Sequence, residues 1–78
     1  MNDLERLKNL IGADFNEDDI ICSMIDKEDT EVIVDHNGQK SHFEGYGICT
    51  LYLAYYNCEE DIFYEIWIND DNVITEVR

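Results

Sequence analysis

The chain has 78 residues, of which 19 are acidic and five are basic, and its formal net charge at pH 7 is −14. This charge argues against direct binding to nucleic acid or to anionic lipid, because their phosphates would be repelled. An apolar content of 45% with nine aromatic residues argues against disorder, and the length fits a single domain over residues 1–78.

The three cysteines, Cys22, Cys49 and Cys58, are an odd number and form no CxxC pair. This favours buried, reduced thiols and therefore a reducing, cytoplasmic compartment. The N-terminal residues show neither the basic region nor the apolar region of a signal peptide. No apolar run approaches the roughly 18 residues that a transmembrane helix needs.

The first predicted element is an amphipathic helix over residues 2–11. Asn2 suits the N-cap position, and Glu5 three residues later completes a capping-box pattern. Gly12 suits the position just after the helix. The apolar residues at helical spacing are Leu4, Leu7, Leu10 and Ile11. So short a helix needs a sheet to pack against, because it would not be stable alone.

The next segments predict an acidic connection and then a strand. Residues 13–19 are rich in carboxylates, with Phe15 expected to reach into the core. The apolar run at residues 20–26 predicts the first strand, and the polar residues 27–29 predict a turn.

A β-hairpin is predicted over residues 30–43. Residues 30–35 alternate in polarity, and Asn37-Gly38 is the strongest two-residue signal for a type I′ turn. A hairpin closed at this turn pairs Asp35 with Lys40, which is a favourable cross-strand pair.

The central strand is predicted at Gly47–Tyr56, the longest run of the chain without a charge. Its β-branched and aromatic residues suit a strand, and apolar residues on both faces indicate that both faces are covered. The glycines of residues 45–47 predict a bulge or bend just before it. A helix over residues 51–62 remains an alternative, because short apolar runs fit both periods.

Two further strands are predicted at residues 62–68 and 73–78, joined by a polar turn at residues 69–72. The simplest register places Glu65 opposite Glu76, which is unfavourable. This pair indicates either a different register or a surface that binds a cation.

The predicted fold class is therefore α+β, with one N-terminal helix packed on a five-stranded antiparallel meander sheet. The second face of this sheet carries apolar residues that one helix does not cover: Ile21, Ile25, Trp67 and Ile74. Such a patch is typical of a contact site or a dimer interface.

The sequence contains no specific catalytic or metal-binding motif. Residues 14–18 begin like a calcium-binding EF-hand loop, but Asp19 stands where that loop requires glycine. His36 and His42 do not form zinc spacing with the cysteines, and a pairing of His42 with Cys49 lacks an activating context. The sequence therefore predicts a protein that is not an enzyme and uses no cofactor or metal.

The carboxylates gather at predicted turns and strand ends. Alternate residues of a strand project to one face about 6.6 Å apart, and two steps of a DNA strand advance about 6.8 Å. A sheet edged with carboxylates can thus present charge at roughly phosphate spacing to a basic groove. A solvated acidic surface without this role is the alternative interpretation.

Small size, strong acidity and the absence of a catalytic motif resemble the phage-encoded inhibitors of bacterial defence, including anti-CRISPR and anti-restriction proteins that mimic DNA. The resemblance lies in general character, so no functional residue is carried over from it. It implies a non-enzymatic inhibitor that blocks the nucleic-acid site of a basic partner, such as a CRISPR effector, in the host cytoplasm. Immunity proteins against nuclease toxins and small self-associating domains, including homodimers, are the alternatives.

The residues expected to bind the partner are acidic side chains of the turns and three aromatic anchors. Charge steers association and aromatic residues supply binding energy. These residues are Glu17, Asp18, Asp19, Glu28, Asp29, Glu31, Glu59, Glu60, Asp61, Asp70, Asp71, Tyr55, Tyr56 and Trp67.

Overall fold

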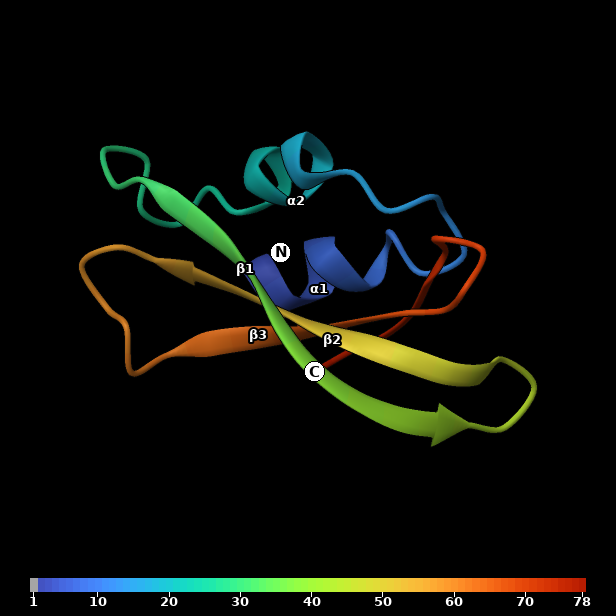
Figure 1. The fold of residues 1–78 in the computed structure, drawn as a ribbon. Coiled ribbons are helices and arrows are strands. Elements are labelled where there is room, and N and C mark those ends of the chain that lie inside the picture. The colour runs from blue at the N-terminus through green and yellow to red at the C-terminus, as the bar shows by residue number, and fades with distance from the viewer. Residues whose placement is uncertain (1) are drawn as a thin grey trace.

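Two short helices lie over one face of a four-stranded antiparallel sheet in a computed structural model that describes residues 2–78 (Figure 1). The helices are α1 (Asp3–Lys8) and α2 (Glu17–Ser23). The strands are neighbours in chain order and comprise β1 (Val32–Phe43), β2 (Gly47–Tyr56), β3 (Phe63–Ile68) and β4 (Ile74–Val77). The predicted single helix on a five-stranded sheet is therefore wrong, although the antiparallel meander order is correct.

Helix α1 begins as its sequence predicts and ends earlier. The Asn2 side chain accepts a hydrogen bond from the Glu5 backbone N–H at 2.9 Å, which confirms the N-cap. The chain leaves the helix after Lys8 and turns at Gly12, whose φ of 94° favours glycine. The Gly12 N–H then bonds the carbonyl of Ile74 at 2.8 Å, which fixes α1 beside β4.

Helix α2 replaces the strand predicted over residues 20–26. Asn16 caps it by accepting from the Asp18 N–H at 2.8 Å, and three acidic residues fill its first turn, where the helix dipole favours them. The apolar run also fits a helix, because Ile20 and Met24 lie four positions apart and are both buried. The apolar run alone fits both a helix and a strand, and the N-cap with the acidic first turn favours the helix.

The predicted hairpin turn at Asn37-Gly38 is wrong, because β1 continues through these residues without reversing direction. His36 pairs with Tyr52 and Lys40 with Thr50, so three residues of β1 lie opposite one residue of β2. Gly38 has a φ of 84°, which this bulge requires. The Asn-Gly pair thus supplies a positive φ for a bulge rather than for a turn.

The real hairpin turn lies between Phe43 and Gly47, where a bulge or bend was predicted. Phe43 pairs with Gly47, and the Tyr46 N–H donates to the Phe43 carbonyl at 3.0 Å. Gly45 has a φ of 87° within this turn. The predicted pairing of Asp35 with Lys40 is consequently absent from the described chain, where Asp35 lies opposite Leu53.

Strand β2 has the predicted bounds, and the alternative helix over residues 51–62 is excluded. The predicted register of β3 and β4 is wrong. Trp67 lies opposite Glu76, and Glu65 exchanges backbone hydrogen bonds of 2.8 and 3.0 Å with Arg78. Ile68 pairs with Ile74, one residue beyond the predicted partner, and an irregularity between Trp67 and Ile68 adds a second residue of shift, which separates the two glutamates.

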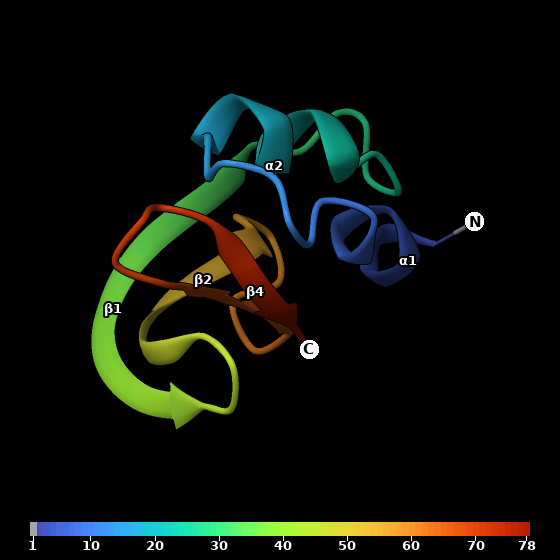
Figure 2. The same cartoon turned by 90° about the vertical axis from the view of Figure 1, so that its right-hand side faces the viewer.

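Buried side chains lie on both faces of the sheet. The core beneath the helices comprises Leu7, Ile20, Met24, Ala54, Tyr56, Ile66, Ile68, Ile74 and Val77. On the other face Trp67 is buried with Cys49 and Leu51, and its ring lies 5.2 Å from that of Phe43. Strand β1 bends through a wide arc (Figure 2). Phe43 at the end of β1 and Leu53 in β2 pack against this second core.

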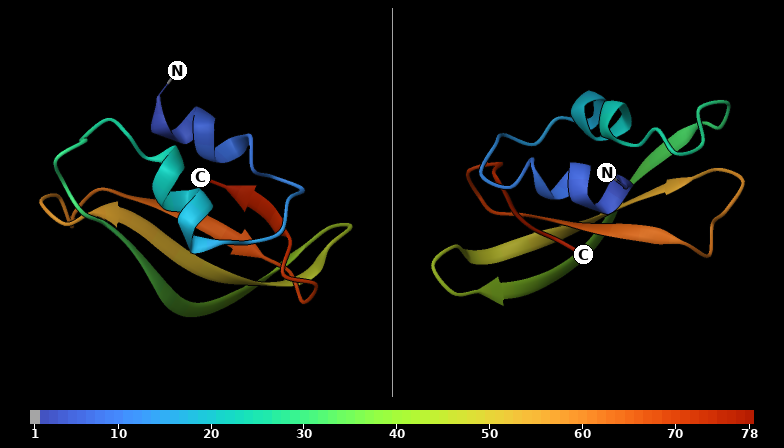
Figure 3. Two further views of the ribbon diagram at one scale, coloured as in Figure 1. Left: turned by 90° about the horizontal axis from the view of Figure 1, so that it is seen from above. Right: turned by 180° about the vertical axis from the view of Figure 1, so that it is seen from behind.

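The open apolar patch predicted on the second face does not form. Trp67 and Ile74 are buried in different cores, at 3% and 1% exposure. Ile21 and Ile25 lie on and just after α2, which covers the helical side of the sheet (Figure 3), and they remain exposed there.

Candidate functional site

The turn before β1 and the turn between β2 and β3 lie together at one end of the molecule (Figure 1). The Lys27 ammonium contacts the Glu59 carboxylate at 2.6 Å, and the Asn57 N–H donates to the Glu31 carbonyl at 2.9 Å. Glu59 raises the pKa of Lys27, first through this hydrogen bond and then through its charge. These contacts gather six carboxylates, here named the end cluster: Glu28, Asp29, Glu31, Glu59, Glu60 and Asp61.

The other predicted acidic residues lie elsewhere. Glu17, Asp18 and Asp19 form the first turn of α2. Asp70 and Asp71 lie in the β3–β4 turn, at the opposite end of the sheet from the end cluster (Figure 1). The predicted binding residues are thus divided among three places, and the end cluster holds the largest group.

The three predicted aromatic anchors differ in exposure. Tyr55 is half-buried, and its hydroxyl donates to the Asp35 carboxylate at 2.6 Å. Tyr56 and Trp67 are buried at 5% and 3% exposure and pack in the two cores. Their burial leaves Tyr55 as the predicted anchor that a partner can touch.

A row of apolar side chains crosses the sheet beside the end cluster and was missed by the sequence reasoning. Ile33 pairs with Tyr55, and Tyr55 pairs with Phe63, so the three lie side by side on the face away from the helices. Phe63 is 47% exposed, and Ile62 before it is 59% exposed. This outer row becomes visible only once the correct strand register is known.

A groove on the helical side also adjoins the end cluster. Its volume is about 570 Å³, and it lies between the end of α2 and the start of β1. It is lined by Ile21, Met24, Ile25, Lys27, Glu28, Thr30, Glu31 and Val32. The spacing of Ile21 and Ile25 was a sequence signal for this surface, once residues 17–23 are recognised as a helix.

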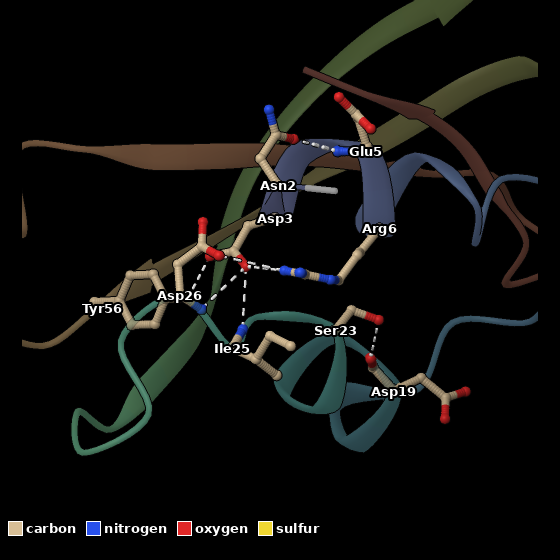
Figure 4. Close-up of polar contacts among 9 residues, drawn as sticks. All are labelled: Asn2, Asp3, Glu5, Arg6, Asp19, Ser23, Ile25, Asp26 and Tyr56. Carbon is tan, nitrogen blue, oxygen red and sulfur yellow. Dashed lines mark hydrogen bonds and ion pairs between the residues drawn. The ribbon is translucent and has the colours of Figure 1, made fainter.

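Asp3 fixes the segment after α2, which lines the groove and leads into the turn that carries Glu28, Asp29 and Glu31 (Figure 4). It is completely buried, and one of its carboxylate oxygens accepts from the Ile25 N–H and from Arg6, each at 3.1 Å. Arg6 also contacts Asp26 at 3.3 Å. The Tyr56 hydroxyl donates to the second oxygen of Asp3, and burial followed by this carboxylate raises the pKa of Tyr56 well above its usual range.

Within residues 2–78, no group of three or more His, Cys, Asp or Glu side chains has an arrangement that could hold a metal ion. The calcium-like segment at residues 14–18 has other contacts. The Asn16 side chain caps α2, and Phe15 exchanges hydrogen bonds of 2.7 and 3.2 Å with Asn72. The three cysteines are free thiols, with Cys49 buried against Thr75.

No family model matches the chain, and no curated protein or solved structure matches it. Neither of the two helices described has the length and apolar character needed to cross a membrane. The surfaces around the end cluster are therefore the features of the molecule from which a function is inferred.

Proposed function

We propose that the protein is a non-enzymatic inhibitor that binds a basic, nucleic-acid-handling protein and covers its nucleic-acid site. The end cluster is the centre of the binding surface. The observation that carries the proposal is the set of contacts that holds two acidic turns together, between Lys27 and Glu59 and between Asn57 and Glu31. Turns joined in this way lose less freedom when a partner binds.

Charge and aromatic contact both support this surface. Six carboxylates at one end of a chain with a net charge of −14 attract a basic groove and accelerate association. Tyr55 and the exposed Phe63 lie directly beside them and can bury apolar area at the centre of an interface. A groove built for nucleic acid offers both basic side chains and stacking surfaces, which match this combination.

The experiment begins with capture of partners from a bacterial lysate at low and then at high salt. Each captured protein is identified and then mixed with labelled DNA, and displacement of the DNA by the chain is measured. We expect capture to weaken steeply with salt and the chain to displace the DNA. Captured proteins that keep their DNA at saturating chain would overturn the proposal, and capture of a nuclease toxin would favour an immunity protein.

A pair of charge-matched variants locates the surface. One variant carries Glu28→Lys, Glu31→Lys, Glu60→Lys and Asp61→Lys. The control carries Asp18→Lys, Asp19→Lys, Asp70→Lys and Asp71→Lys, which change the net charge equally. We expect the first variant to lose about tenfold or more in displacement of DNA and the control to lose much less. Equal losses would show that net charge, rather than the end cluster, determines binding.

A further inference from the structure

The groove between α2 and β1 has apolar walls that remain open to solvent. Met24 is buried at 4% exposure and forms part of the core beneath, whereas Ile21 and Ile25 are 40% and 45% exposed. Val32 at the start of β1 forms the facing wall. A volume of about 570 Å³ is within the range of sites that hold a ligand group.

The polar residues that line the groove make it negative. Glu28 and Glu31 belong to the end cluster, and both line the groove. Lys27 is the cation among the described lining residues, and its ammonium is already engaged by Glu59 at 2.6 Å. An occupant therefore meets apolar surface flanked by two carboxylates.

These features select one class of occupant. A second copy of this chain also carries a net charge of −14, so it would be repelled. A neutral apolar ligand would remove water from Glu28 and Glu31 without giving them a partner, which is costly. A segment that carries both large apolar and basic side chains can pack against the apolar walls and pair with the two carboxylates at the same time.

The groove is also held in shape before any partner arrives. The Ile25 N–H and, at 3.4 Å, the Asp26 N–H both donate to the buried Asp3 carboxylate. The Tyr56 hydroxyl accepts from the Asp26 N–H at 3.0 Å. Because this segment is fixed to α1 and β2, binding in the groove requires little reordering of the backbone.

We propose that this groove takes an apolar side chain from a cationic amphipathic segment of the partner, with basic residues of that segment paired to Glu28 and Glu31. This inference rests on the proposed function and deepens it, because it names the partner's chemistry at one site. The apolar contact makes part of the binding resistant to salt, whereas contact with the end cluster alone is screened by salt.

The test uses two synthetic peptides of about twelve residues, or three helical turns. One contains lysine and leucine at amphipathic spacing, and the other contains serine in place of leucine at equal charge. Fluorescence anisotropy measures binding to the full chain at about 50 and about 300 mM salt. We expect the leucine peptide to bind about tenfold more tightly than the serine peptide, and the preference to persist at high salt.

Matched isoleucine variants test whether the preference for the leucine peptide arises in the groove. Ile21→Gln with Ile25→Gln should reduce the preference to within about twofold while binding of the serine peptide is retained. The control, Ile11→Gln with Ile48→Gln, changes two isoleucines that are 37% and 47% exposed outside the groove lining and the end cluster, and it should keep the preference. Amide chemical shifts of the unaltered chain give an independent readout, since the leucine peptide should move signals of residues 21–32.

Several outcomes would overturn the inference. Equal binding of the two peptides would show that the groove holds no apolar side chain, while the charge-based function would still stand. Binding of neither peptide would contradict both the groove contact and the proposed function. A loss of preference in the control variant, or shifts centred on residues 62–63, would move the apolar contact to another surface. A doubled mass of the chain by light scattering, lost in the Ile21 and Ile25 variant, would make a second copy the occupant.

Discussion

The Tyr56 hydroxyl donates a hydrogen bond to the carboxylate of Asp3, which lies 53 positions earlier in the chain. Through Asp3 the end of β2 is joined to α1 and to the segment that follows α2. The same segment leads into the turn that carries Glu28, Asp29 and Glu31. The position of the proposed binding surface therefore depends on one buried carboxylate.

Replacement of Asp3 by alanine should destabilise the fold strongly. The Ile25 N–H and the Tyr56 hydroxyl would lose their acceptor, and Arg6 would keep only its contact with Asp26. Removal of one partner of a buried ionic network costs about 3 kcal/mol or more. Tyr56→Phe, which removes a single hydroxyl, should cost about 1 kcal/mol. Urea unfolding followed by circular dichroism measures both. Asp70→Ala in the β3–β4 turn is the control, and a comparable loss there would contradict the role of Asp3.

Stability should fall on the alkaline side of pH 10. Burial and the Asp3 carboxylate raise the pKa of Tyr56, so the folded chain keeps this hydroxyl neutral when the unfolded chain ionises it near pH 10. The unfolded state then binds fewer protons than the folded state, and stability decreases as pH rises through this range. The stabilisation is fully present below pH 10.

The urea midpoint between pH 8 and pH 11.5 measures this effect. Tyr56→Phe should give a shallower alkaline decline than the unaltered chain, whereas Tyr46→Phe, at an exposed position, should leave the slope unchanged. Burial also raises the pKa of Tyr64, so some decline should remain in the Tyr56 variant. Identical slopes in the unaltered chain and the Tyr56 variant would show that Tyr56 does not contribute.

The sequence predicted best where a local pattern and the long-range packing agree. The bounds of β2 follow from an uncharged run that is buried in both cores, and the Asn2 cap follows from side-chain chemistry within one helical turn. Prediction failed over residues 20–26, where the apolar run fits a helix and a strand equally well. The acidic first turn after Asn16 carried the information that decides between them.

The predicted hairpin was wrong because a turn signal depends on two neighbouring residues, whereas the pairing of β1 with β2 depends on residues far apart in the sequence. Asn37-Gly38 suits any site that needs a positive φ, and the sheet uses it as a bulge. The outer row and the groove depend on this register and on α2, so neither could be assembled from the sequence. The acidic segments at residues 27–31, 59–61 and 70–71 were identified correctly as turns, whereas residues 17–19 belong to α2. Only the structure shows which of the turns meet.

Alanine at Gly45 should destabilise the chain by about 1–2 kcal/mol, because its φ of 87° is costly for residues with a Cβ. A Cβ at Gly45 would meet no atom within 4 Å, so the cost comes from the backbone alone. Gly38→Ala should have a similar effect, and Ser41→Ala in the same strand is the control. Chemical denaturation measures all three, and a neutral Gly45 variant would contradict the observed hairpin turn.

Replacement of Lys27 by glutamine should strengthen the binding of cationic probes without changing the urea midpoint. The ion pair with Glu59 is exposed to solvent, so it adds little to stability, and the backbone hydrogen bond between Asn57 and Glu31 still joins the two turns without it. The loss of Lys27 therefore frees one carboxylate of the end cluster. The net charge changes from −14 to −15, and the lysine–serine peptide should bind about two- to threefold more tightly. Lys40→Gln changes the net charge equally at a site bonded to Thr50, away from the end cluster. Because screening limits charge effects to about 10 Å at 0.1 M salt, the Lys40 variant should gain less. Equal gains in both variants would mean that the peptide responds to total charge and does not bind at the end cluster.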